Sequence, residues 1–127
     1  MRQSTILPSK AQLEIIKVVW RLGETRVRDV YEDLRIRRSI AYTTVMTMMK
    51  KMESKGLLIK RSDGKAFVYK AATPKSRMLK QIVDDFIDGV FNGSEKLLLE
   101  HMVEERLLSE KMIEKVIRMI RDKNRQC

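Results

Sequence analysis

Residues 41–54 combine hydroxyl, apolar and basic side chains at helical spacing. One face is apolar at positions i, i+3, i+4 and i+7, the pattern of a half-buried helix, and consists of Val45, Met48, Met49 and Met52. The opposite face is small, polar or basic, with Thr43, Met46, Thr47, Lys50 and Ser54. Hydroxyl and ammonium groups on an exposed helix face can hydrogen-bond base edges and phosphates in a DNA major groove. The segment therefore predicts contact with duplex DNA.

A β-hairpin is predicted directly after this helix. Gly56 stands where helices commonly end in a left-handed cap. Two strand-like runs, 57–61 and 66–71, then flank the turn sequence 62–65. An amphipathic helix followed by a basic hairpin is typical of the recognition helix and wing of a winged helix-turn-helix. Residues 41–54 are thus the predicted recognition helix, and 61–66 the predicted wing.

The first half of a recognition helix faces base edges, and a wing reaches the DNA backbone. The residues predicted to contact DNA are Ser39, Ala41, Tyr42, Thr43, Thr44, Met46, Thr47, Lys50, Lys51, Arg61 and Lys65. Of these, Lys51, Arg61 and Lys65 are expected to position the duplex through phosphates rather than to read its sequence.

The positive charge lies in the same part of the chain. Residues 1–75 hold 17 Lys and Arg against 7 Asp and Glu, whereas residues 76–127 hold 10 of each. The whole net charge of +10 therefore belongs to the part that carries the predicted recognition helix. Such a localised excess is typical of a surface that binds phosphates. The alternative is that these side chains only form a solvated face.

The elements before the recognition helix complete a winged-helix order. Ser9 and Gln12 form a capping-box sequence that predicts a helix start, and Gly23 predicts its end. The apolar stripe of this first helix comprises Leu13, Ile16, Val19 and Trp20. A short extended piece at 25–27 is expected to lead into a second helix at 28–34. Helix, helix, helix and hairpin give a mainly α fold with a small β-hairpin wing.

The second half of the chain reads as three helices without strands. We predict a winged helix DNA-binding domain at 1–73 and a helical dimerisation domain at 74–127, since fifty residues in short helices cannot easily bury this much apolar surface alone. The residues predicted to lie between two copies are Phe86, Val90, Phe91, Leu97, Leu98, Met102, Leu107, Val116 and Ile120. The alternative is that these stripes pack into one monomeric core.

Other classes of site have little support. The single histidine, His101, has no metal-ligand spacing around it, and no nucleotide-binding glycine motif is present. We therefore predict no catalytic residues, no metal, no cofactor and no enzymatic activity. The sequence lacks a membrane-length apolar run and an apolar signal core. With a single cysteine, Cys127, and so no intrachain disulfide, the expected location is cytoplasmic.

The chain resembles the BlaI/MecI penicillinase-repressor family. The residues that carry the resemblance are LEIIKVVW at 13–20, AYTTVMTMMKKM at 41–52, KGL at 55–57, GKAFVY at 64–69 and FNGS at 91–94. The likeness runs from about residue 7 to residue 120. It implies a winged-helix transcriptional repressor that binds a (pseudo)palindromic operator as a homodimer, with double-stranded DNA and a second copy as partners.

The inducing signal is not implied by the resemblance. Penicillin-responsive members are cleaved at an Asn-Phe bond, and the matching pair in this chain is His101-Met102. Copper-responsive relatives carry a C-terminal cysteine cluster, where this chain has Cys127 alone. A partner protease, a ligand or oxidation at Cys127 remain as alternatives for release from DNA. Two alternatives to the whole interpretation are a ligand-sensing winged-helix regulator of another family and a winged-helix module that binds protein or RNA.

Overall fold

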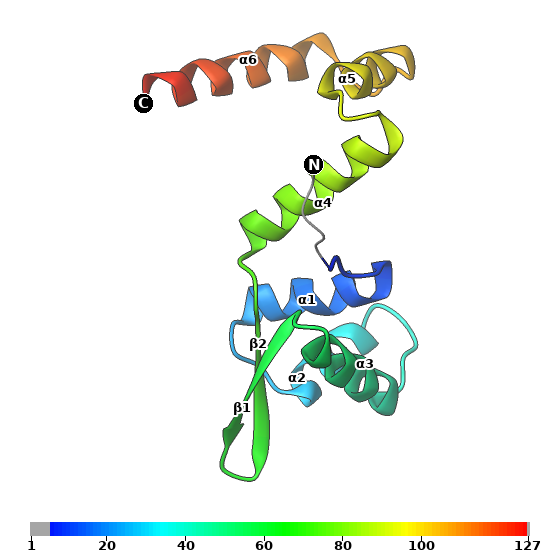
Figure 1. Cartoon of the computed structure of the whole chain (residues 1–127), viewed down its shortest axis with the longest axis vertical. Coiled ribbons are helices and arrows are strands. Elements are labelled where there is room, and N and C mark those ends of the chain that lie inside the picture. Colours follow the sequence, from blue (N-terminus) through cyan, green and yellow to red (C-terminus); the bar gives the residue numbers. More distant parts are fainter. Residues whose placement is uncertain (1–5, 127) are drawn as a thin grey trace. The chain divides into compact units, whose positions relative to one another are not determined.

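The structure is a computed structural model that describes residues 6–126. Cys127, for which the sequence predicted no intrachain disulfide, lies outside the described residues, as do residues 1–5. The order of elements is α1 (Lys10–Leu22), α2 (Val27–Arg35), α3 (Tyr42–Ser54), β1 (Leu58–Asp63), β2 (Ala66–Ala71), α4 (Lys75–Val90), α5 (Glu95–Glu104) and α6 (Glu110–Arg125) (Figure 1). The predicted fold class, mainly α with one β-hairpin wing, is confirmed.

Helix α1 begins and ends as its sequence predicts. The Gln12 N–H donates to Ser9 Oγ at 3.2 Å, and the Ser9 N–H donates to Gln12 Oε1 at 2.9 Å. This reciprocal pair satisfies amide groups that the first turn leaves without helical partners. At the other end Gly23 adopts a φ of 79°, which L side chains rarely adopt, and its N–H donates to the Val19 carbonyl.

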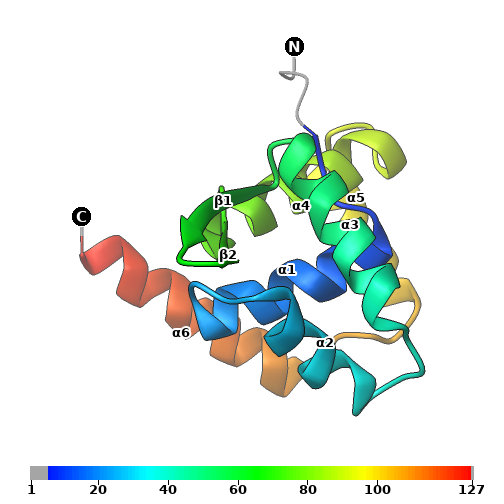
Figure 2. The same cartoon turned by 90° about the horizontal axis from the view of Figure 1, so that it is seen from below.

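The core of the first unit forms where the three helices meet the hairpin. The predicted inward residues of α3 are confirmed, since Val45, Met49 and Met52 are buried and Met48 packs against them. Ile15 and Val18 are also fully buried, although the predicted stripe of α1 omitted them. The predicted stripe itself is confirmed, since Ile16 and Val19 are buried and Leu13 and Trp20 pack against the core. The buried face is wider than that stripe because α1 contacts α2, α3 and β2 (Figure 2).

The hairpin is tied to the segment before α2. Strands β1 and β2 pair antiparallel from Leu58 opposite Ala71 to Asp63 opposite Ala66, around a two-residue turn that Gly64 opens at a φ of 67°. Thr25 and Tyr69 exchange two backbone hydrogen bonds, of 2.9 and 2.7 Å. The predicted extended piece at 25–27 is therefore shorter than expected, because Val27 is already the first residue of α2.

The described chain forms two compact units, which divide between Ile82 and Val83 within α4. Met78 is 2% exposed and Ile82 packs against the core of the first unit. The Trp20 indole N–H donates to the Thr73 carbonyl at 3.0 Å. The start of α4 thus completes the winged core, whereas the sequence predicted a functional division at 73 and 74. That functional division stays a prediction.

The second unit leaves most of its apolar side chains uncovered within one chain. Ser94 and Ser109 accept from the amides of Leu97 and Met112 and so cap the starts of α5 and α6. Ile87 is buried, and the rings of Phe86 and Phe91 meet edge to face at 5.7 Å. No residue of α5 or α6 is buried.

Candidate nucleic-acid interface

The outer face of α3 presents hydroxyl and ammonium groups to solvent. Thr43, Thr47 and Lys50 are exposed, as the sequence predicted, because the buried methionines fix the opposite face of the helix in the core. Met46 is half-buried between the two faces. At the start of the helix the Tyr42 ring packs edge to face on Tyr31 at 5.5 Å. This contact restrains Tyr42 at the edge of the exposed face.

The N-terminus of α3 has no side-chain cap. Ala41 is the capping residue and offers no oxygen, while its carbonyl accepts the Thr44 and Val45 amides. The amides of the first residues of a helix have no partner within the helix, and they suit an anion such as a phosphate. Ser39, Ala41 and Thr44 are exposed beside them. The predicted contact residues of 39–47 are thus brought together at one helix end.

A groove of about 260 Å³ runs between α3 and the wing. Its lining residues are Arg26, Val27, Arg28, Tyr42, Met46, Lys50, Ala66, Phe67 and Tyr69. Arg28 and Lys50 supply positive charge to this groove, and among the described residues neither has an ion-pair partner. Arg28 and Phe67 were missing from the predicted site. Arg28 was assigned only to a helix, and its place beside Lys50 depends on how α2 packs against α3.

The wing has two chemically different faces. Strand alternation puts Lys60 on the same face as Phe67, and the Lys60 ammonium lies 4.6 Å from the centre of the Phe67 ring, a cation–π distance. Phe67 is 53% exposed and lines the groove. Arg61 lies on the other face, opposite Val68. Lys65 is exposed at the turn.

Arg61 forms a two-point ion pair with Glu24. Arg61 Nε donates to Glu24 Oε1 at 2.9 Å, and Arg61 Nη2 donates to Oε2 at 2.7 Å. This hydrogen-bonded pairing lowers the pKa of Glu24 and raises the pKa of Arg61. A second pair joins Arg26 Nη2 to Asp63 Oδ2 at 3.2 Å. The face of the wing that carries Arg61 therefore holds two arginine–carboxylate pairs, and Lys70 lies on the same face, opposite Ile59.

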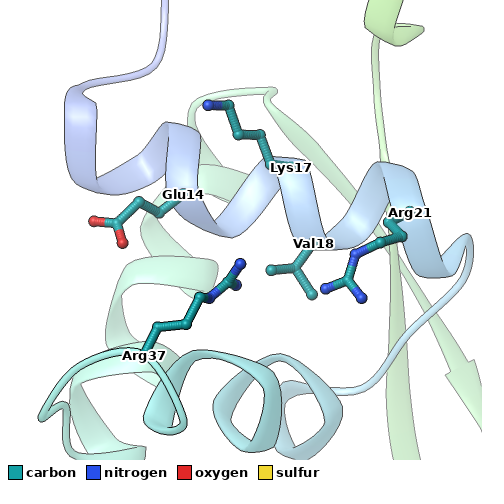
Figure 3. Close-up of a pocket in the computed structure, with 5 residues that line it drawn as sticks. All are labelled: Glu14, Lys17, Val18, Arg21 and Arg37. Atoms are coloured by element: carbon teal, nitrogen blue, oxygen red, sulfur yellow. The ribbon is translucent and has the colours of Figure 1, made fainter.

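A second basic area lies over α1 and the turn after α2. Glu14, Lys17, Val18, Arg21 and Arg37 line a cleft of about 220 Å³ (Figure 3). Figure 3 shows the Arg21 and Arg37 guanidinium groups on either side of Val18. Both pair with Asp33, and Arg38 pairs with Glu14 at 3.1 Å. Carboxylates of the same chain already pair with these arginines, so the cleft attracts a bound anion less strongly than its number of basic side chains suggests.

The residues predicted to join two copies all lie in the second unit or in α4 beyond Ile82. Six of them are exposed within one chain, namely Phe86, Val90, Leu97, Leu107, Val116 and Ile120. Phe91, Leu98 and Met102 are half-buried. Phe91 contacts both Phe86 and the ring of His101, so part of the set forms a small cluster of its own.

Comparison with known proteins decides the family. The model of the penicillinase repressor family matches residues 8–122. The chain belongs to this family. Its members repress transcription by binding DNA, and this chain is accordingly a DNA-binding transcriptional repressor. The resemblance seen in the sequence is confirmed, and the alternative of a regulator from another family is wrong.

Individual relatives are similar over most of the chain. The methicillin resistance regulatory protein MecI of Mammaliicoccus sciuri is 24% identical over 123 residues, 97% of this chain and 100% of that one. The penicillinase repressor of Bacillus licheniformis is 25% identical over 119 residues, 93% of each. The solution structure of monomeric Bacillus licheniformis BlaI in complex with the blaP half-operator is 29% identical, with a TM-score of 0.49 over 57% of this chain and 87% of that chain.

Within residues 6–126 no three His, Cys, Asp or Glu side chains are grouped so that they could hold a metal ion. No helix there is long and apolar enough to span a membrane. The exposed face of α3, the groove beside it and the wing form the candidate interface, because exposed hydroxyl and basic side chains gather there.

Proposed function

We propose that this repressor acts as a homodimer on a (pseudo)palindromic operator, with α3 in the major groove and the wing on the backbone. Ser39, Ala41, Tyr42, Thr43, Thr44, Met46, Thr47 and Lys50 face the bases and adjoining phosphates, and Lys51, Arg61 and Lys65 face the backbone. The exposed hydroxyl face of α3, held in place by a buried methionine face, supports this assignment. A DNA partner also supports action in the cytoplasm.

The observation that carries the dimer is the uncovered apolar stripe of α6. Met112, Ile113, Val116, Ile117 and Ile120 recur at helical spacing, and each is at least 36% exposed in the single chain. Contiguous apolar surface of this kind usually marks an interface. A second copy fits because a palindromic site is read by two identical recognition helices related by a twofold axis.

Point variants in the full chain test this proposal. Val116→Asp places a charge in the stripe, so we expect a sedimenting monomer with an unchanged helical circular dichroism spectrum. Arg118→Ala is the matched control, because it lowers the net charge by the same amount on the opposite side of α6. Loss of the second half-site should weaken operator binding by about 100-fold or more. A Val116→Asp protein that still dimerises would place the interface elsewhere.

DNA binding is measured by mobility shift against the region upstream of the chain's own gene, at two salt concentrations. We expect binding that weakens steeply with salt and that prefers a palindromic sequence over random DNA. A protein that acts through RNA or protein contacts alone would show neither property.

A further inference from the structure

Arg61 differs from the other proposed contact residues because a carboxylate already occupies it. Four of the eleven proposed DNA-contact residues carry positive charge, and within residues 6–126 Arg61 alone of the eleven forms an ion pair. The pair with Glu24 uses Nε and one terminal nitrogen of the guanidinium. A DNA phosphate would use the same planar edge for a two-point contact.

Glu24 is held in place rather than meeting Arg61 by chance. Its neighbour Thr25 makes both backbone hydrogen bonds with Tyr69 of β2. Alternation along paired strands puts Glu24 and Arg26 on the face of the hairpin that carries Arg61 and Asp63. Backbone pairing therefore keeps Glu24 and Arg61 on one face of the hairpin, where their side chains can reach each other.

The pair is chemically persistent but adds little to folding. The hydrogen bonds from Arg61 lower the pKa of Glu24, and a glutamate is ionised at neutral pH even without such a shift. Both side chains are about half exposed, and exposed ion pairs contribute little to stability. A role in DNA binding accounts for a fixed, exposed carboxylate on a basic wing better than a role in stability does.

We propose that Glu24 is a built-in competitor of DNA phosphate for Arg61, and that it sets the sequence-independent part of DNA affinity. The proposal rests on the wing contact proposed above. While Arg61 stays with Glu24, it neutralises no phosphate, and so no counterion is released from the DNA. When Arg61 moves to a phosphate, it leaves the Glu24 carboxylate unpaired beside the duplex. In both cases the net gain from Arg61 is small.

The test uses a random-sequence duplex, with affinity measured by fluorescence anisotropy between 50 and 200 mM salt. Glu24→Gln should bind more tightly than the parent and gain about 0.9 in the slope of log K against log salt. This gain corresponds to about a 3.5-fold larger loss of affinity across that salt range. Arg61→Gln alone should change the slope little, whereas Lys65→Gln should reduce it by about 0.9.

The double variant and a remote control identify the cause. Glu24→Gln should have no effect in an Arg61→Gln background, because its partner is already gone. Glu100→Gln removes a carboxylate paired with Lys96 at 3.7 Å in α5, so it reports the effect of net charge alone. Weaker binding by Glu24→Gln, an effect equal to that of Glu100→Gln, or an effect that persists without Arg61 would each overturn the proposal.

Failure of the wider interface gives a different pattern. A parent protein without salt-dependent duplex binding would overturn both the wing contact and the competition. The parent slope could instead be steep and fall with Lys65→Gln, while Glu24→Gln binds with the affinity and slope of the parent. That result would overturn the competition but leave the wing contact in place. Thermal unfolding of each variant checks that the exposed substitutions leave the fold unchanged.

Discussion

Neutralising Lys50 is expected to remove one phosphate contact from the groove between α3 and the wing. Lys50 is exposed, lines this groove with Arg28, and has no ion-pair partner among the described residues. No internal carboxylate therefore has to be displaced before its ammonium meets a phosphate. Lys50→Gln keeps a long polar side chain and removes the charge, so the core face of α3 is untouched.

The magnitude follows from counterion release. Each phosphate contact contributes about 0.9 to the slope of log K against log salt, or about 3.5-fold in affinity between 50 and 200 mM salt. Lys50→Gln should reduce the slope by about that amount, and Arg28→Gln by the same. If both side chains contact separate phosphates, the double variant should lose about 1.8 in slope, or about 12-fold over this salt range.

Anisotropy titrations with a fixed duplex measure these slopes. Lys17→Gln is the matched control, since it removes the same charge from the cleft over α1, in the same unit but outside the groove. We expect its slope to stay close to that of the parent. Equal losses for Lys17→Gln and Lys50→Gln would refute the reasoning, because general net charge rather than a placed contact would then explain both.

Three further outcomes are expected. Thr43→Ala and Thr47→Ala should each weaken operator binding by about 1–3 kcal/mol per lost base contact, while binding to random DNA changes less. If both variants keep the parent's preference for operator over random DNA in anisotropy titrations, these threonines do not read bases. Met49→Ala removes a fully buried side chain, so the free energy of unfolding should fall by about 2–5 kcal/mol in denaturant titrations. The His101-Met102 bond lies within α5, where cleavage requires local unwinding, and this pair differs from the Asn-Phe pair that the family's protease selects. Mass spectrometry after cell-wall stress should therefore find an intact chain. A fragment ending at His101 would contradict this.

The local elements were predictable because their signals are local. The capping box of Ser9 and the turn around Gly64 each depend on residues a few positions apart, and both form as expected. The burial of Ile15 and Val18 was not predictable, because it depends on elements that pack on α1 from several sides. Helical periodicity identifies one inward face, but it does not show how wide that face is.

Contacts between distant residues explain what the sequence left out of the site. Glu24 and Arg61 are 37 positions apart, and their pairing depends on how β2 docks on Thr25. The same packing brings Arg28 to the groove. No spacing rule links such positions, since the distance between them is set by the tertiary fold. The predicted wing was therefore in the right place, while the ion pair that modifies its chemistry was not foreseen.

The net charge points to the winged unit as the proposed interface, but it overstates the charge that is free to meet DNA. In the described part of the winged unit, six arginines are paired with carboxylates, namely Arg21, Arg26, Arg35, Arg37, Arg38 and Arg61. The planar guanidinium matches a carboxylate at two points, whereas an ammonium on a flexible chain gains less from such pairing. Among the described residues, Lys50, Lys51 and Lys65 accordingly have no ion-pair partner around α3 and the wing. The sequence-independent affinity should therefore depend on these lysines and Arg28 rather than on the full count of basic residues.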